Sequence, residues 1–213
     1  MTAHRAGWCV AALALVAVQA LPAAWRDALA FDRAALRDGQ LWRLVSAHCV
    51  HLGWRHAALN LACLTVCAPL VARRHRAGPV LVGLAALTGG LLWAFAPGVE
   101  RYVGLSGVIY ALAVLGLAPL ARRGWLGRGL LAALFVRVGW QLVAGAPPAE
   151  AVWLGGPVAA EGHLAGLAAG LLWLGGAAVV ASRRGGGPGQ GGPLEPFEPL
   201  PGVDGRSSAA RSE

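Results

Sequence analysis

The chain has 213 residues, of which 57% are hydrophobic and only 13% are charged, and its mean hydropathy is +0.58. This composition is far too apolar for a soluble domain of this size, so it excludes soluble enzymes and predicts an integral membrane protein. The net charge of +8 does not indicate a nucleic-acid partner, because the arginines stand in short clusters at the ends of apolar segments, without interleaved aromatic residues.

Six segments are long and apolar enough to be transmembrane helices, which need about 17 to 25 such residues. We therefore expect an all-α integral membrane protein, a bundle of six transmembrane helices within residues 1–182. Residues 183–213 turn to Gly, Pro, Ser and charged residues, which predicts a disordered cytoplasmic tail. The predicted spans are residues 8–24, 56–72, 79–96, 104–121, 129–146 and 161–181.

The basic residues indicate the topology. All of them are arginines, and their clusters lie in one compartment if every span crosses the membrane. By the positive-inside rule that compartment is the cytoplasm, which places both termini there. A cleaved signal peptide ending near residues 21–24 is the alternative for the first span, but no secreted domain follows it. The clusters are Arg5; Arg73, Arg74 and Arg76; Arg122, Arg123 and Arg128; and Arg183 with Arg184.

A loop of about 30 residues separates the first two predicted spans, which is long for a small bundle. In it Trp25 and Trp42 stand beside Arg26 and Arg43. Such a mixture is typical of short amphipathic helices half-immersed in the membrane interface. We therefore expect this loop to be a functional element on the outer side.

Polar residues gather at the start of three spans. The second, fourth and sixth spans all run from outside to inside in this topology. His56 and Asn60 lie near the start of the second, Ser106 near the start of the fourth, and His163 near the start of the sixth. The sequence therefore predicts that these four side chains share one depth, a little below the outer surface.

These residue types suit nucleophilic catalysis. Ser106 would be the nucleophile at the N-terminal end of its helix, where free N–H groups favour developing negative charge. His163 would take its proton. Glu161 lies two residues away on another helix face, so we expect a Ser-His dyad whose imidazole is oriented by packing.

Two further features would complete such a site. His56 and Asn60 are four residues apart on one helix face and offer N–H donors to an oxyanion. Gly162, Gly166 and Gly170 form overlapping GxxxG spacings that allow close approach of helices, and Gly104 and Gly107 flank Ser106. Each motif alone is more often a packing notch or an interfacial histidine; their shared depth favours a functional site.

A metal site is the less favoured interpretation. His48, His51 and His56 are spaced three and five residues apart, but no carboxylate converges on them. Cys9, Cys49, Cys63 and Cys67 include no CxxC pair, so we interpret all four as packing residues. We expect no metal and no cofactor.

Arg137 is unusual because it lies near the middle of the fifth predicted span. A charge there costs about 2.5 to 3.5 kcal/mol on insertion scales. It faces either the bundle or a water pocket, with Gln141 one turn later, or it extends along the helix to the interface. The sequence leaves both alternatives open.

The chain resembles the rhomboid family of intramembrane serine proteases. The resemblance implies Ser106 as nucleophile, His163 as general base and acid, and His56, Asn60 and the Ser106 backbone N–H as oxyanion donors. Tyr110 resembles the family's aromatic residue that packs against the catalytic histidine. The matching residues are Leu41 to Leu44, His51, His56 to Asn60, Gly104 to Leu112, and His163 to Gly166 with Gly170.

Within that family the short chain and the stretch from His48 to His56 look most like the rhombosortases. That resemblance implies a bacterial inner-membrane protein with its site facing the periplasm. The implied partners are the lipid bilayer and membrane-anchored substrates with a C-terminal Gly-Gly, a hydrophobic span and a basic cluster. The alternatives are a general rhomboid protease of other single-span substrates, a non-catalytic relative that binds membrane helices, and a small transporter, although no internal repeat supports the last.

Overall fold

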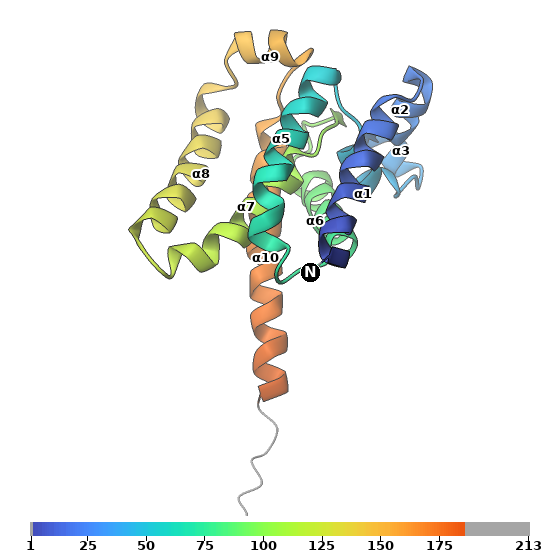
Figure 1. Ribbon diagram of the computed structural model, residues 1–213. Helices are drawn as coiled ribbons and strands as arrows, with labels where there is room; N and C mark the ends of the chain where they lie inside the picture. Colours follow the sequence, from blue (N-terminus) through green and yellow to red (C-terminus); the bar gives the residue numbers. More distant parts are fainter. Residues whose placement is uncertain (1, 186–213) are drawn as a thin grey trace, which may run out of the picture.

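The computed structural model describes residues 2–185, and most of the predicted tail therefore lies outside the described residues (Figure 1). Six long helices form the body of the molecule. The start of α1 and the end of α10 lie at the same side in Figure 1. The long helices are α1 (Thr2–Gln19), α5 (Trp54–Val71), α6 (Ala77–Phe95), α7 (Ser106–Ala121), α8 (Trp125–Ala144) and α10 (Ala160–Gly185).

Three of these helices are long and apolar enough to cross a membrane, namely Ala77–Phe95, Trp125–Ala144 and Ala160–Val180. Shorter apolar helical segments cover Ala6–Gln19 and Ser106–Ala121. The molecule is thus a helical membrane protein, and the count of six spans stays a prediction.

The first predicted span differs from the helix observed. It was expected over residues 8–24, but α1 ends at Gln19 and a new helix, α2 (Ala23–Leu29), begins after Pro22. Proline lacks an N–H and pushes the preceding residue out of the helical region, so the chain turns here.

The long loop folds into short elements over one end of the bundle. They are α2, β1 (Phe31–Asp32), α3 (Arg33–Arg37), α4 (Arg43–Ser46) and a single 3₁₀ turn at Ala47–Cys49. Asp32 caps α3, because its Oδ1 accepts a hydrogen bond of 3.0 Å from the Ala35 N–H. The short strand β1 pairs antiparallel with β2 (Arg101–Tyr102), a feature that the expected all-α fold did not include.

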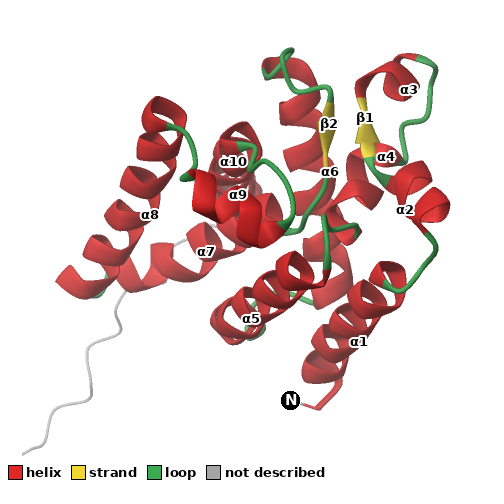
Figure 2. Cartoon of the chain, turned by 90° about the horizontal axis from the view of Figure 1, so that it is seen from above, coloured by secondary structure: helices red, strands yellow, loops and turns green. Residues whose placement is uncertain are grey.

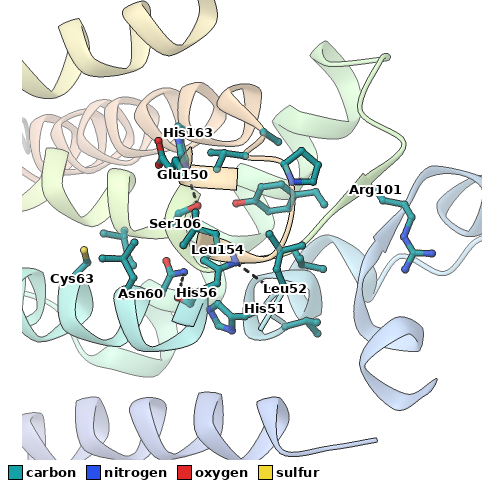
Figure 3. Close-up of a pocket in the computed structure, with 18 of the residues that line it drawn as sticks. His51, Leu52, His56, Asn60, Cys63, Arg101, Ser106, Glu150, Leu154 and His163 are labelled. Atoms are coloured by element: carbon teal, nitrogen blue, oxygen red, sulfur yellow. Dashed lines mark hydrogen bonds between the residues drawn. The ribbon is translucent and has the colours of Figure 1, made fainter. Parts of the chain in front are cut away.

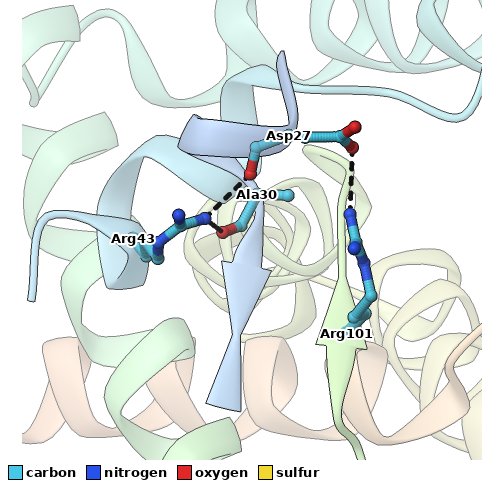
Figure 4. Close-up of polar contacts among 4 residues, drawn as sticks. All are labelled: Asp27, Ala30, Arg43 and Arg101. Carbon is cyan, nitrogen blue, oxygen red and sulfur yellow. Dashed lines mark hydrogen bonds and ion pairs between the residues drawn. The ribbon is translucent and has the colours of Figure 1, made fainter. Parts of the chain in front are cut away.

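Two buried arginines hold this loop in place: Arg33 attaches it to the end of α6, and Arg43 ties parts of the loop to one another. Arg33 donates to four carbonyls at and beyond the end of α6, those of Leu92, Trp93, Ala96 and Val99. Arg43 donates to the carbonyls of Asp27 at 2.8 Å and Ala30 at 2.6 Å, and Arg101 pairs with the Asp27 carboxylate (Figure 4). These charges are therefore structural, because they satisfy carbonyls that helix and loop ends leave free.

Helix α7 is the centre of the molecule. Val108, Ala111, Leu112 and Val114 are fully buried in it, and it contacts α5, α6, α8 and α10. Figure 2 shows α8 at the side of the bundle, and only Gly127, Val138 and Gln141 of α8 are buried. The short helix α9 (Pro148–Leu154) connects the C-terminal end of α8 to α10.

Candidate active site

Ser106 is the first residue of α7, and His163 lies in the first turn of α10. The Nε2 atom of His163 is 2.9 Å from Oγ of Ser106 (Figure 3). His163 is buried, with 6% of its surface exposed. The structure thus places the predicted nucleophile and base in hydrogen-bonding contact, the arrangement needed to transfer a proton from the hydroxyl.

Glycines allow the two helices to come this close. A Cβ atom on Gly166 would collide with the backbone of Gly107, and one on Gly107 would lie 2.7 Å from the Gly162 carbonyl. A Cβ on Gly170 would lie 2.9 Å from the Ala111 carbonyl. Gly166 and Gly170 of the predicted GxxxG pattern therefore face α7, whereas a Cβ on Gly162 would collide with the Tyr102 ring.

The imidazole of His163 is held on two sides. The ring of Tyr110, one turn after Ser106, stacks on it with centroids 4.6 Å apart and 29° between the planes. Its Nδ1 atom lies 2.9 Å from Oε1 of Gln141 on α8. Packing alone was expected to orient this ring, so the side-chain amide at Nδ1 is a contact that the sequence interpretation missed. A buried glutamine in an apolar span was the available signal.

Gln141 also connects His163 to a pair of charges. When its amide is turned about its last bond, Nε2 donates to His163 Nδ1 at 2.9 Å and Oε1 accepts from Arg137 Nη2 and Nη1 at 3.1 and 3.2 Å. Arg137 Nη2 lies 3.2 Å from Oε2 of Glu150 on α9. Arg137 therefore faces the inside of the site and the α9 carboxylate, the first of the two alternatives left open by the sequence.

His56 and Asn60 lie beside this pair on α5, and both are buried. The backbone N–H of Leu52 donates to His56 Nδ1 at 3.4 Å, so a neutral His56 carries its proton on Nε2 and offers a donor there. Asn60 donates one amide N–H to the His56 carbonyl at 2.9 Å and keeps a second.

Gly104 shapes the loop before the serine. Its φ of 121° is a conformation that side chains disfavour, and a Cβ there would lie 2.7 Å from the His56 ring. Its carbonyl accepts from His48 Nδ1 at 3.2 Å and from the Tyr102 hydroxyl at 3.0 Å. The Tyr102 oxygen in turn accepts from the Gly107 N–H at 3.3 Å.

His48 and His51 support the site from the loop. Burial lowers the pKa of His48 to about 4. Burial, with the neighbouring His56, lowers the pKa of His51 to about 3. Both imidazoles are therefore neutral at pH 7, and His51 packs edge-on against the His56 ring at 5.2 Å between centroids.

A cavity of about 540 Å³ opens over these residues (Figure 3). Its wall includes residues of both α5 and α8, as well as Ser106 and His163. Within residues 2–185, no cluster of three or more His, Cys, Asp or Glu side chains has the geometry to hold a metal ion. A nucleophile, a base, N–H donors and an open cavity define the class of site found in serine hydrolases.

The Rhomboid domain model matches residues 38–178, which include every element of this site. The chain therefore belongs to the rhomboid family, whose members are intramembrane serine proteases that act on membrane-protein substrates. The predicted family resemblance is confirmed. No curated protein matches the chain.

Proposed function

We propose that this chain is an intramembrane serine endopeptidase that cleaves membrane-anchored proteins near the outer end of a transmembrane span. The observation that carries the proposal is the 2.9 Å contact between His163 Nε2 and Ser106 Oγ at the floor of an open cavity. The N–H donors of His56 and Asn60 beside this contact support the proposal further. Proteolysis needs such donors to stabilise the oxyanion, whereas a serine–histidine contact that only packs two helices together does not.

In the proposed reaction Ser106 Oγ attacks the scissile carbonyl while His163 takes the hydroxyl proton. His56 Nε2–H, the free Asn60 amide N–H and the Ser106 backbone N–H stabilise the oxyanion. His163 then gives its proton to the leaving amine as the peptide bond breaks. A second nucleophile, water or another amine, releases the product from the acyl-enzyme, again with His163 as base.

Substrate reaches the cavity from the lipid between α5 and α8. The cavity wall includes Leu59 and Cys63 of α5 and Arg137 of α8, and few residues of α8 are buried. A transmembrane helix hides its carbonyls in internal hydrogen bonds, so it must unwind locally before cleavage. Polar cavity groups near Ser106 are suited to receive the unwound segment.

The first test is labelling of the detergent-solubilised protein with a fluorophosphonate probe. We expect wild type to be labelled, and Ser106→Ala and His163→Ala to be unlabelled while their melting temperatures stay close to wild type. Labelling that persists in Ser106→Ala would contradict the proposed nucleophile. A folded wild type that neither takes the probe nor cleaves a membrane substrate would favour a helix-binding protein without catalysis.

Within the family we propose rhombosortase-like substrates, supported by the sequence from His48 to His56. Two single-span reporters separate the alternatives: one ends in Gly-Gly, a hydrophobic span and a basic cluster, and the other has the same span without Gly-Gly. Preferential cleavage of the first is expected. Equal cleavage of both would indicate a general rhomboid protease instead.

A further inference from the structure

The arrangement of Arg137, Gln141 and His163 has a consequence for the proton of the catalytic dyad. Gln141 is 1% exposed, so its amide has no solvent to satisfy it and must find its partners within the protein. On one side it meets His163 Nδ1, and on the other it meets Arg137. The two orientations of this amide are not equivalent.

With Oε1 toward His163, the imidazole donates its Nδ1–H to the amide and Nε2 is free to take the Ser106 proton. The amide NH₂ then faces the guanidinium of Arg137, which has only donors. With the amide turned, Oε1 accepts from two Arg137 N–H groups at 3.1 and 3.2 Å, and Nε2 donates to His163 Nδ1 at 2.9 Å. The turned orientation gives a hydrogen-bond partner to both ends of the amide.

The turned orientation also changes the tautomer of His163. Because Nδ1 then accepts a hydrogen bond, the proton of the neutral ring lies on Nε2 and points at Ser106 Oγ. In that tautomer the histidine cannot accept the serine proton, and a wrongly placed proton on a catalytic histidine is known to be costly to turnover.

We infer that Gln141 is a positioning residue that sets the tautomer of His163, and that Arg137, anchored by Glu150, holds it in the unreactive form. This inference rests on the proposed function, because it concerns the same dyad. Arg137 is 43% exposed and lines the cavity, so oxygen atoms of a bound chain compete with Gln141 for its N–H groups. The resting site is therefore restrained until the cavity is occupied.

Other groups near His163 do not supply this control. Tyr110 contributes a ring face from α7, Ser106 contributes the hydroxyl, and His56 lies on α5. Gln141 is the residue whose amide lies at the Nδ1 atom. A carboxylate at position 141 would accept from both Arg137 and the Nδ1–H in a single arrangement, which removes the restraint.

The test compares fluorophosphonate labelling rates. We expect Gln141→Glu and Arg137→Met to label at least about tenfold faster than wild type. Gln141→Leu should label at least about tenfold slower, because leucine offers no acceptor for the Nδ1–H that the reactive tautomer and the protonated ring both carry. Arg137→Met should bring no gain in the Gln141→Leu background, because Arg137 acts through Gln141. Arg128→Met, a change of the same kind at an exposed position of α8, is the control and should label like wild type.

A purely structural role of Gln141 and Arg137 predicts that Gln141→Glu and Arg137→Met label more slowly than wild type. Slower or unchanged labelling of both variants would overturn the inference.

The tautomer itself is measurable without activity. Long-range ¹H–¹⁵N spectra of ¹⁵N-histidine-labelled protein assign the His163 ring by the signals lost in His163→Gln. We expect the Nε2–H tautomer in wild type and the Nδ1–H tautomer in Gln141→Glu. An Nδ1–H tautomer in wild type would overturn the inference while leaving the proposed function intact, whereas a failure of the proposed function appears as absent labelling in every variant.

Discussion

Asn60 and His56 are the side chains that we propose as oxyanion donors beside Ser106. Asn60 uses one N–H on its own helix and retains the other. Truncation at Asn60 should therefore remove one donor and leave α5 intact. We expect Asn60→Ala to lower kcat roughly a hundredfold or more, as for loss of an oxyanion-hole donor.

Steady-state cleavage of a membrane reporter checks this expectation. Asn60→Asp has the same size but lacks the amide donor, so it should be impaired to a similar degree. Turnover close to wild type in both variants would show that Asn60 serves packing only.

His48 makes stability depend on pH. Its pKa is about 4 in the folded protein, against 6.5 for an ordinary histidine, because burial disfavours the charged ring. As pH falls below 6.5, His48 of the unfolded chain gains a proton that the folded protein does not bind. The free energy of unfolding is therefore highest above pH 6.5 and declines toward pH 4. Over this whole pH range, the free energy of unfolding that is lost through His48 is on the order of 3 kcal/mol.

Denaturation in detergent at pH 7 and pH 5 measures this dependence. His48→Gln keeps an N–H for the Gly104 carbonyl but cannot titrate. We expect the variant to lose less stability than wild type between the two pH values. An equal loss in both proteins would mean that other groups produce the dependence.

At the scale of elements, the α7–α10 contact determines whether the dyad forms. Gly166 faces the Gly107 backbone so closely that any side chain must push α10 away, which separates His163 from Ser106. Gly166→Ala should destabilise the protein by about 1 to 3 kcal/mol through overpacking, and it should reduce fluorophosphonate labelling at least about tenfold.

The same helix offers a matched control. A Cβ atom at Gly175 meets no atom within 4 Å, so Gly175→Ala adds the same methyl group without a collision. Its labelling rate and melting temperature should equal or exceed those of wild type. If Gly166→Ala and Gly175→Ala behaved alike, close helix approach would not be what assembles the dyad.

At the scale of the whole molecule, helix lengths are consistent with a site below the outer surface. Helix α7 has 16 residues and is about 24 Å long, shorter than a hydrocarbon core of about 30 Å. Helix α10 has 26 residues, about 39 Å, and its C-terminal part extends beyond the bundle in Figure 1. A short α7 would leave Ser106 within the membrane's outer part, reached through the cavity.

The predicted topology is testable with fusions. Alkaline phosphatase joined after Gly145 should be active, because α8 would end outside, and a fluorescent protein joined to the C-terminus should fluoresce, because α10 would end in the cytoplasm. A dark C-terminal fusion would contradict the cytoplasmic placement of this end. A processed N-terminus would favour the signal-peptide alternative for α1.

The sequence by itself indicated the membrane class, the approximate helices and the residues Ser106, His163, His56 and Asn60, because hydropathy, arginine clusters and positions at span starts are local properties of the chain. The β1–β2 pairing was missed because residues 31–32 and 101–102 are distant in sequence. The break at Pro22 was missed although the proline itself is its local signal. Only the tertiary structure decided that Gln141 meets His163 Nδ1 and that Arg137 faces Glu150. Those contacts depend on how α8 is rotated about its axis and how closely it approaches α10, and a helix that is apolar on most sides carries no periodic signal for either.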